Sequence, residues 1–216
     1  MTKLVIFDLD GTLLNSLQDL AMSTNYALRQ HGYPTHKLPA FRYFVGNGIN
    51  KLLERALPES ERTEENMLKI REDFVAYYAE HKADFTAPYD GICELLKDLK
   101  RRGMLLAVAS NKYHSATVAL IPEYFGEGLF DFVYGQRDGV PIKPDPTIVF
   151  DIMKEAGVLK DEVLYVGDSG VDMQTAVNSG VASVGVTWGF RDREELLKNG
   201  ARYIADQPWE ILKFIR

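Results

Sequence analysis

The chain has 216 residues, more than one typical domain and fewer than two, so we expect one core domain with a smaller accessory module. Hydrophobic residues make up 46% and charged residues 26% of the sequence, which is ordinary for a globular protein and excludes a disordered chain. The formal net charge of −6 disfavours a nucleic-acid-binding protein, because such a protein needs a basic face. An anionic substrate would have to be attracted locally, by a cation or by a few placed positive groups.

The cysteine content and the apolar runs limit the setting of the protein. Its single cysteine, Cys93, excludes an internal disulfide framework and fits a reducing compartment, so we expect a cytoplasmic protein. The longest aliphatic runs, residues 4–7 and 104–109, are much too short to cross a bilayer. We therefore expect neither a membrane nor a nucleic acid as a partner, and we expect a monomer or a homodimer.

Short apolar runs alternate with amphipathic stretches along most of the chain. The first run, residues 3–8, predicts a buried strand that ends at a glycine-containing turn. Apolar residues at helical spacing from Ile92 to Leu99 predict a helix that stops at Gly103. Further strands are predicted at residues 104–109, 130–134, 163–167, 182–186 and 203–204. Further helices are predicted up to about Leu120, from Asp145-Pro146 to about Gly157, up to about Ser179, after Arg191 and at the end of the chain.

Residues 15–86 interrupt this alternation, which otherwise indicates right-handed βαβ units. The segment has no convincing strand and predicts several helices separated by glycines and prolines, with Ser16 and Asp19 at capping-box spacing in the first. We therefore predict an α/β fold: a doubly wound, mostly parallel sheet covered on both faces, with a helical cap domain inserted after the first strand. The core would comprise residues 1–14 and 87–216, and the cap residues 15–86.

Two aspartates close the first predicted strand. Asp8 and Asp10 are two residues apart on extended backbone, so their side chains can point into one space. Ligands of open α/β sheets bind outside the carboxyl ends of the strands, where these side chains lie. Two such anions repel each other unless a cation joins them, and Mg²⁺ suits them because it is held by carboxylates, phosphate and water. The sequence therefore predicts a Mg²⁺ site at this edge of the sheet.

Polar residues also follow other predicted strands: Ser110 and Asn111 after the second, Lys143 in a strand-to-helix loop, and Asp168 after the fourth, with Asp172 one helical turn later. Together with the first two aspartates they indicate phosphoryl transfer, in which one carboxylate attacks phosphorus and forms an aspartyl-phosphate. A metal and a lysine would neutralise the phosphoryl oxygens, and a hydroxyl and a backbone amide would hold a third oxygen. The second aspartate would transfer protons.

The order of these motifs resembles that of phosphatases of the haloacid dehalogenase superfamily, and the likeness covers essentially the whole chain. Residues 8–13 (DLDGTL) are similar to the first motif of that family, which implies that Asp8 is the nucleophile and Asp10 the general acid/base. Ser110 is similar to the Ser/Thr of the second motif, and Lys143 to the lysine of the third. The resemblance also implies a Rossmann-like core.

Gly167-Asp168 followed by Asp172 resembles the acidic fourth motif of the family. This resemblance implies that Mg²⁺ is held by the side chains of Asp8 and Asp168 and by the main-chain carbonyl of Asp10, with Asp172 in support. The residues that it implies for phosphate binding are Ser110, Asn111 and Lys143.

The insert after the first strand resembles the helical cap of the family's first cap class. A cap of the second class does not fit between the second and third motifs, because a predicted helix and strand take up most of residues 111–142. Residues 44–57 are similar to the cap segment of phosphoglycolate phosphatases, and residues 187–190 and 200–204 are also similar to that group. This resemblance implies 2-phosphoglycolate as the leading substrate. The candidate substrate loop comprises Arg42, Gly46, Asn47 and Gly48. Asn15 departs from the family pattern, where many relatives carry Asp, which puts the polarity of the hinge into the cap in doubt.

Each motif also has a structural interpretation that the sequence leaves open. The alternatives are a turn at Asp10-Gly11, helix caps at Ser110 and Asp172, a solvated loop lysine at Lys143, a helix–helix turn at residues 46–48 and a surface arginine at Arg42. Other functions remain open as well: a sugar-phosphate mutase, a pyrophosphatase or nucleotidase of the same superfamily, and a degenerate, phosphate-responsive regulatory module.

Overall fold

The computed structural model describes residues 1–215, and the chain divides into two compact units. The first unit combines Met1–Leu14 with Pro88–Arg216, and the second comprises Asn15–Ala87. We call them the sheet unit and the helical unit.

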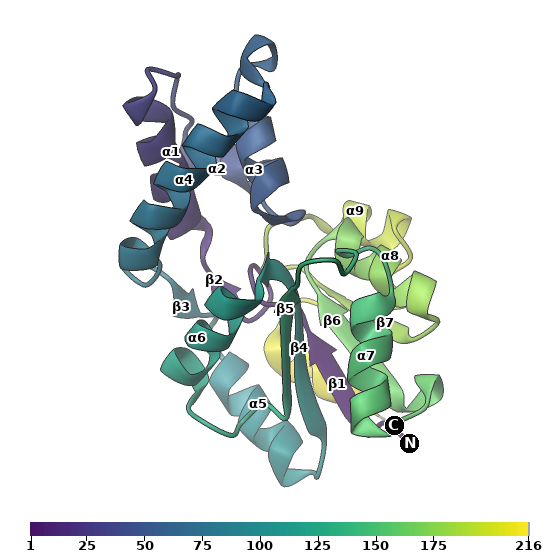
Figure 1. Ribbon diagram of the computed structural model, residues 1–216. Helices are drawn as coiled ribbons and strands as arrows, with labels where there is room; N and C mark the ends of the chain where they lie inside the picture. Colours follow the sequence, from purple (N-terminus) through teal and green to yellow (C-terminus); the bar gives the residue numbers. More distant parts are fainter. Residues whose placement is uncertain (216) are drawn as a thin grey trace. The chain divides into compact units, whose positions relative to one another are not determined.

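The sheet unit is built on a six-stranded sheet in which every paired strand is parallel (Figure 1). Its strands are β1 (Leu4–Phe7), β4 (Leu105–Tyr113), β5 (Phe132–Gln136), β6 (Val163–Gly167), β7 (Ala182–Val186) and β8 (Tyr203–Ala205). Their order is β5-β4-β1-β6-β7-β8, so the chain winds outward in both directions from β1. Such a switch point is where open α/β sheets bind ligands, beyond the carboxyl ends of the strands. The predicted α/β fold with a doubly wound, mostly parallel sheet is confirmed.

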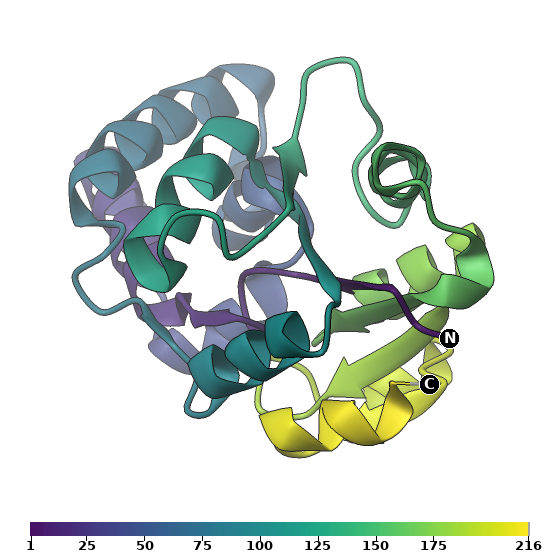
Figure 2. The ribbon, with the colours of Figure 1, turned by 90° about the horizontal axis from the view of Figure 1, so that it is seen from below.

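Helices cover both faces of this sheet (Figure 2). They are α5 (Ile92–Arg101), α6 (His114–Phe125), α7 (Thr147–Ala156), α8 (Gly170–Ser179) and α9 (Arg193–Lys198), with 3₁₀ helices η2 (Lys160–Glu162) and η3 (Pro208–Phe214). Phe7 of β1 belongs to a core cluster with Leu96 of α5 and Leu120 of α6, whereas its neighbour Ile6 belongs to another with Val149 of α7. Successive side chains of a strand point to opposite faces, so a strand buried on both sides needs an uninterrupted apolar run.

The helical unit contains α1 (Leu17–Gln30), α2 (Leu38–Phe44), α3 (Gly48–Ala56), the 3₁₀ helix η1 (Glu59–Glu61) and α4 (Glu64–His81). The sequence predicts no strand in residues 15–86. Residues 16–86 hold none, whereas Asn15 is the second residue of the short strand β2 (Leu14–Asn15). Helices α1 and α4 pack along each other and bury a stripe that includes Leu20 and Phe74. A separate pair of two-residue strands, β2 (Leu14–Asn15) and β3 (Ala87–Pro88), forms where the chain leaves and re-enters the sheet unit.

The capping box predicted at Ser16 and Asp19 is wrong. Ser16 is the N-cap residue of α1, but its side chain makes no capping hydrogen bond. The Asp19 carboxylate instead accepts hydrogen bonds from the backbone N–H groups of Phe85 and Thr86 and from the Thr86 hydroxyl, at 2.7–3.1 Å. These donors come from the far end of the helical unit, which a local spacing rule does not include.

Two predicted strands are shifted at their ends. The strand predicted at residues 104–109 continues to Tyr113, because its polar end still pairs with β5 through Tyr113 and Gln136. The strand predicted at residues 130–134 begins two residues later. Phe130 is buried in the core cluster although it precedes the strand. It is apolar because it packs in the core, and it does not pair with a neighbouring strand.

Several element boundaries agree with the sequence. Strands β6 and β7 occupy the predicted residues, and α8 ends at Ser179. The final helix is a 3₁₀ helix, and α6 runs past its predicted end to Phe125 with Pro122 inside it. Across residues 1–215 no helix is both long enough and apolar enough to cross a membrane.

Candidate active site

Three buried carboxylates meet at the carboxyl ends of the two central strands. Asp8 directly follows β1, Asp168 directly follows β6, and Asp172 lies in the first turn of α8. Each offers an oxygen atom within 4.8 Å of the other two. We call these residues the acidic cluster. Strand pairing between Phe7 and Val166 sets Asp8 level with Gly167, one residue before Asp168, so the first two carboxylates emerge at the same edge of the sheet.

Asp172 is held in the cluster by its position at the start of α8. Ser169 and Asp172 form a capping box, in which the Ser169 hydroxyl accepts from the Asp172 backbone N–H. The carboxylate Oδ2 accepts in return from the backbone N–H and the hydroxyl of Ser169, at 3.1 and 2.5 Å. Its other oxygen, Oδ1, faces the cluster. The helix-capping interpretation of Asp172 and a place in the site therefore hold together.

Lys143 pairs with two members of the acidic cluster, Asp8 and Asp172. Its Nζ donates to Asp8 Oδ1 at 2.8 Å, to Asp172 Oδ1 at 2.7 Å, to the Tyr165 hydroxyl at 3.1 Å and to the Ala109 carbonyl at 2.9 Å. The residue is 2% exposed, so it is not a solvated loop lysine. A buried ammonium is stable only where carboxylates and hydrogen bonds replace its water, which is the arrangement here.

The electrostatics of the cluster follow from burial and crowding. Burial, followed by the repulsion of Asp172, raises the pKa of the Asp8 carboxyl to about 7, although Lys143 acts in the opposite direction. Burial and the charges of Asp172 and Asp8 likewise raise the pKa of Asp168 well above its usual value. Burial alone would lower the pKa of Lys143, but the neighbouring carboxylates outweigh it and hold that pKa well above its usual value.

The donor set of the acidic cluster fits a hard divalent cation. The cluster holds three buried carboxylates, and the Lys143 ammonium pairs with two of them, Asp8 and Asp172, so a cation would offset the repulsion that remains. Asp168 is fixed for this role because its Oδ2 accepts the Phe190 backbone N–H at 2.7 Å and its Oδ1 accepts the Thr12 hydroxyl at 3.3 Å. Carboxylate oxygens are the ligands that Mg²⁺ prefers.

Two glycines allow the backbone to approach Asp168 closely. Gly11 has a φ of +91°, which favours glycine, and a Cβ there would lie 2.3 Å from Asp168 Oδ2. A Cβ on Gly189 would lie 2.3 Å from the Asp168 Cβ atom. The Asp-Gly pair at residues 10–11 is therefore a turn, and the turn is part of how this site is packed.

The Asp10 side chain lies outside the acidic cluster and pairs with a lysine that the sequence analysis did not single out. Lys112 Nζ donates to Asp10 Oδ1 at 3.1 Å and to Oδ2 at 3.0 Å, and the two side chains are only 7% and 14% exposed. Lys112 stands two residues after Ser110 in β4, and the strand predicted from the sequence ends at residue 109, so no pattern in the sequence indicated this pair.

Ser110 and Asn111 lie in β4 and contact the backbone of Lys112 and Lys143, respectively. Ser110 is buried, and its Oγ accepts the backbone N–H of Lys112 at 3.2 Å. It is not a helix cap, because α6 begins at His114 with Tyr113 as the N-cap residue. The Asn111 amide donates to the Lys143 carbonyl at 3.1 Å and its carbonyl accepts the Lys143 N–H at 2.9 Å, so this side chain fixes the lysine loop.

The candidate substrate loop belongs to the helical unit. Arg42 is exposed on α2. Gly46 and Asn47 lie between α2 and α3, and Gly48 is the first residue of α3, so residues 46–48 belong to the helix–helix turn that the sequence left open. Asn47 Oδ1 accepts from Arg55 Nη2 at 2.9 Å, while Arg55 Nη1 donates to the carbonyls of Tyr43 and Phe44. A part for this turn in substrate binding stays a prediction.

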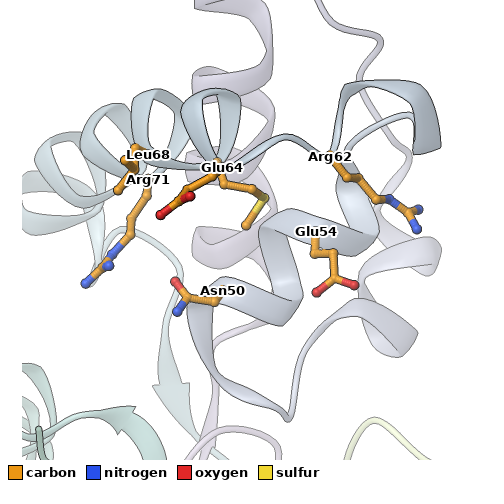
Figure 3. A pocket seen from close by; sticks show the side chains of 7 residues that line it. Asn50, Glu54, Arg62, Glu64, Leu68 and Arg71 are labelled. Atoms are coloured by element: carbon orange, nitrogen blue, oxygen red, sulfur yellow. The ribbon is translucent and has the colours of Figure 1, made fainter.

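A surface pocket lies between α3 and α4 in the helical unit (Figure 3). Its lining consists of Asn50, Glu54, Arg62, Glu64, Met67, Leu68 and Arg71. The guanidinium groups of Arg62 and Arg71 point to opposite sides in Figure 3, whereas ligand sites bring polar groups together. None of the predicted site residues lines it, and we assign it no function.

Comparison with known proteins identifies the family. Residues 5–186 match the family described as haloacid dehalogenase-like hydrolase. A phosphoglycolate phosphatase from Pseudomonas syringae pv. tomato is 36% identical over 213 residues, which cover 95% of this chain and 77% of that protein. Another from Mannheimia succiniciproducens is 32% identical and covers 99% of this chain and 98% of that protein.

Solved structures give the same result for the fold. A protein from Lactobacillus delbrueckii subsp. bulgaricus aligns with a TM-score of 0.92 at 34% identity, covering 100% of this chain and 99% of that one. A predicted phosphoglycolate phosphatase from Haemophilus somnus aligns with a TM-score of 0.92 at 32% identity, covering 100% and 98%. The chain therefore belongs to the haloacid dehalogenase-like hydrolase family and is an enzyme of its phosphatase type.

Proposed function

We propose that this enzyme hydrolyses 2-phosphoglycolate, a small phosphate monoester, through an aspartyl-phosphate formed on Asp8. The observation that carries the mechanism is the contact between a strand-end carboxylate and a buried lysine, with Lys143 Nζ 2.8 Å from Asp8 Oδ1. The substrate rests on the relatives named phosphoglycolate phosphatase. The proposed substrate offers a dianionic phosphate to a protein whose net charge is −6, so placed cations must attract it.

In the first step, a carboxylate oxygen of Asp8 attacks phosphorus, and the bond from phosphorus to the ester oxygen breaks. Asp10 gives the departing alkoxide a proton, so that glycolate leaves as a neutral alcohol at that oxygen. The Lys143 ammonium and the Ser110 hydroxyl bind phosphoryl oxygens. Because these groups are already fixed by buried hydrogen bonds, they need little reorganisation when charge develops.

In the second step, water attacks the phosphorus of the aspartyl-phosphate, and the bond between phosphorus and Asp8 breaks. Asp10 accepts a proton from this water, which returns both carboxylates to their starting state and releases inorganic phosphate. The same residue thus acts first as an acid and then as a base, and the sum of the two steps is hydrolysis of one ester bond by one water.

The acidic cluster is proposed to hold Mg²⁺ through the side chains of Asp8 and Asp168 and the main-chain carbonyl of Asp10. When bound, the ion supplies positive charge next to the phosphoryl oxygens and lowers the repulsion between substrate and carboxylates. Asp172 supports the site by fixing Lys143, whose Nζ lies 2.7 Å from its Oδ1.

The helical unit is proposed to act as a cap over the substrate, with Arg42 and residues 46–48 as its substrate loop. A cap excludes water from the reaction and adds contacts when it closes. We place the enzyme in the cytoplasm, since a single cysteine fits a reducing compartment.

The test is an Asp8→Asn variant, which is nearly isosteric and removes the nucleophile. We expect loss of phosphate release from 2-phosphoglycolate, and we expect beryllofluoride, a phosphate mimic, to bind wild type at Asp8 but not the variant. Asp131→Asn is the matched control, because Asp131 also pairs with a lysine but lies outside the site. Normal turnover by Asp8→Asn would show that another group attacks phosphorus.

A further inference from the structure

We propose that Lys112 selects substrates whose alcohol carries a carboxylate directly on the carbon that bears the ester oxygen. This inference rests on the proposed function, because it assigns a residue to the recognition of the substrate carboxylate. The observation behind it is the contact of the Lys112 ammonium with both oxygens of Asp10, at 3.1 and 3.0 Å.

The position of Lys112 follows from its strand. Lys112 is the penultimate residue of β4, two residues beyond Ser110, and β4 lies next to β1 in the sheet. The Ser110 hydroxyl binds the Lys112 backbone N–H, so the backbone of this segment is fixed. The side chain is 7% exposed and its ammonium reaches across to the loop after β1.

The proposed chemistry sets an upper limit on the distance between Lys112 Nζ and the ester oxygen of the substrate. Asp10 must approach the ester oxygen to within hydrogen-bond distance, about 2.6–3.2 Å, to protonate it. Lys112 Nζ lies 3.0 Å from Asp10 Oδ2, so Nζ is at most about 6 Å from the ester oxygen. In 2-phosphoglycolate the carboxylate is separated from that oxygen by a single methylene, and its oxygens lie roughly 3 Å away. A carboxylate oxygen can therefore meet the ammonium at normal hydrogen-bond distance.

The division of charge in the site supports the same assignment. Lys143 donates to Asp8 and Asp172, so its ammonium belongs to the side where the phosphoryl group is transferred. Lys112 belongs to the side of the proton-transferring carboxylate, where the alcohol part of the substrate must lie. An ester of a neutral alcohol would bring no anion to Lys112. An ester of a 2-hydroxy acid brings one to the right side of the reacting oxygen.

Asp10 gives Lys112 an ordered position before the substrate binds. A flexible lysine loses rotamer freedom when it binds a ligand, and holding it beforehand reduces that loss. When the substrate carboxylate arrives, the ammonium binds it while remaining close to Asp10. Recognition of the carboxylate is then coupled to the placement of the proton-transfer group.

The experiment compares 2-phosphoglycolate with 2-phosphoglycolamide, in which a neutral amide replaces the carboxylate at nearly the same size. We expect wild type to have a kcat/KM for the carboxylate substrate about 10- to 100-fold above that for the amide, as a charge-assisted hydrogen bond gives. In Lys112→Met that ratio should fall to near one. Lys112→Arg should keep much of the ratio, because it keeps the charge.

Lys100→Met is the matched control, because Lys100 also donates to both oxygens of one aspartate, Asp131, at 2.9 and 2.8 Å. It lies on α5 outside the site, and we expect it to keep the wild-type ratio. If wild type itself does not distinguish the two substrates, the proposal is overturned without any variant. An unchanged ratio in folded Lys112→Met, or an equal fall for both substrates, also overturns it.

These outcomes are separate from those that test the proposed function. Hydrolysis of p-nitrophenyl phosphate that requires Asp8, combined with no preference for the carboxylate substrate, would refute the role of Lys112 alone. Turnover that survives Asp8→Asn would refute the proposed mechanism whatever the substrate preference.

Discussion

The charges buried around Lys143 determine what this site can bind. An ammonium that is 2% exposed is compensated by Asp8 and Asp172, and Asp168 adds a further buried carboxylate. Burying charges is costly unless each is paired and hydrogen-bonded, so three carboxylates around a single ammonium mark a place for a ligand cation. The raised pKa values of Asp8 and Asp168 have the same cause, which is burial together with the repulsion of neighbouring carboxylates.

A first prediction concerns the proton-transfer role of Asp10. Asp10→Asn keeps the main-chain carbonyl proposed to bind Mg²⁺ but cannot transfer a proton. For 2-phosphoglycolate we expect a loss of about 10²–10⁴-fold in the rate of aspartyl-phosphate formation, measured in a single turnover. p-Nitrophenyl phosphate should lose much less in that step, because its leaving group needs no protonation. An equal loss for both substrates would contradict the acid role.

The sequence was sufficient to identify site residues that follow strands, but it was insufficient to identify the residues that pair with them. Asp8, Asp168 and Lys143 could be found because each stands directly after an apolar run or in a strand-to-helix loop. The pairing of Lys112 with Asp10 joins residues 102 positions apart and depends on the register between β1 and β4. No local pattern contains that register.

At the scale of elements, buried strands with turns at both ends were predicted best. β6 and β7 have continuous apolar runs between turn signals, and their bounds match the sequence. β4 was predicted too short because its last residues are polar, yet they remain in the sheet as the walls of the site. Functional residues thus obscure a strand end that hydrophobicity alone would define.

A second prediction concerns the hydrogen bonds that join the two ends of the helical unit. Asp19 is 2% exposed, and its carboxylate accepts three donors from Phe85 and Thr86, which fixes the end of the unit to its first helix. Asp19→Ala should lower the free energy of unfolding by roughly 3 kcal/mol, because it leaves buried N–H groups without an acceptor. Urea denaturation followed by circular dichroism measures this loss.

Asp73 provides the control for that measurement. Its carboxylate pairs with His31 at 2.7 Å but is 38% exposed, so Asp73→Ala should cost less than about 1 kcal/mol. A similar small cost for Asp19→Ala would show that water replaces its carboxylate and that the contact does not hold the unit together.

For the molecule as a whole, cation binding should appear as stability. A ligand that binds only the folded state stabilises it by about 2.7 kcal/mol at a concentration 100 times its dissociation constant. For a chain of 216 residues this corresponds to a rise in Tm of roughly 5–10 °C when Mg²⁺ is added to protein treated with EDTA. Asp168→Asn should abolish the rise and Asp131→Asn should keep it. A chelated protein with full activity and no Mg²⁺-dependent shift would exclude the proposed site.

The last prediction joins the helical unit to catalysis. Gly46 and Gly48 have φ values of +117° and +77°, and Arg55 fixes the turn between them through Asn47. Valine at either glycine is strained by at least 1 kcal/mol and deforms the turn. If this turn contacts the substrate when the cap closes, kcat/KM for 2-phosphoglycolate should fall more than kcat/KM for p-nitrophenyl phosphate, because binding energy realised on closure contributes to the rate of the more difficult reaction.

Gly32→Val separates this effect from general strain in the helical unit. Gly32 has a φ of +71° and follows α1, so valine there brings the same backbone penalty at a site with no heavy atom within 4 Å of the added Cβ. We expect this variant to leave the ratio of the two kcat/KM values at its wild-type level. Equal losses for both substrates in Gly48→Val would reduce the turn to a structural linker and would remove the support that the helical unit gives to 2-phosphoglycolate as the substrate.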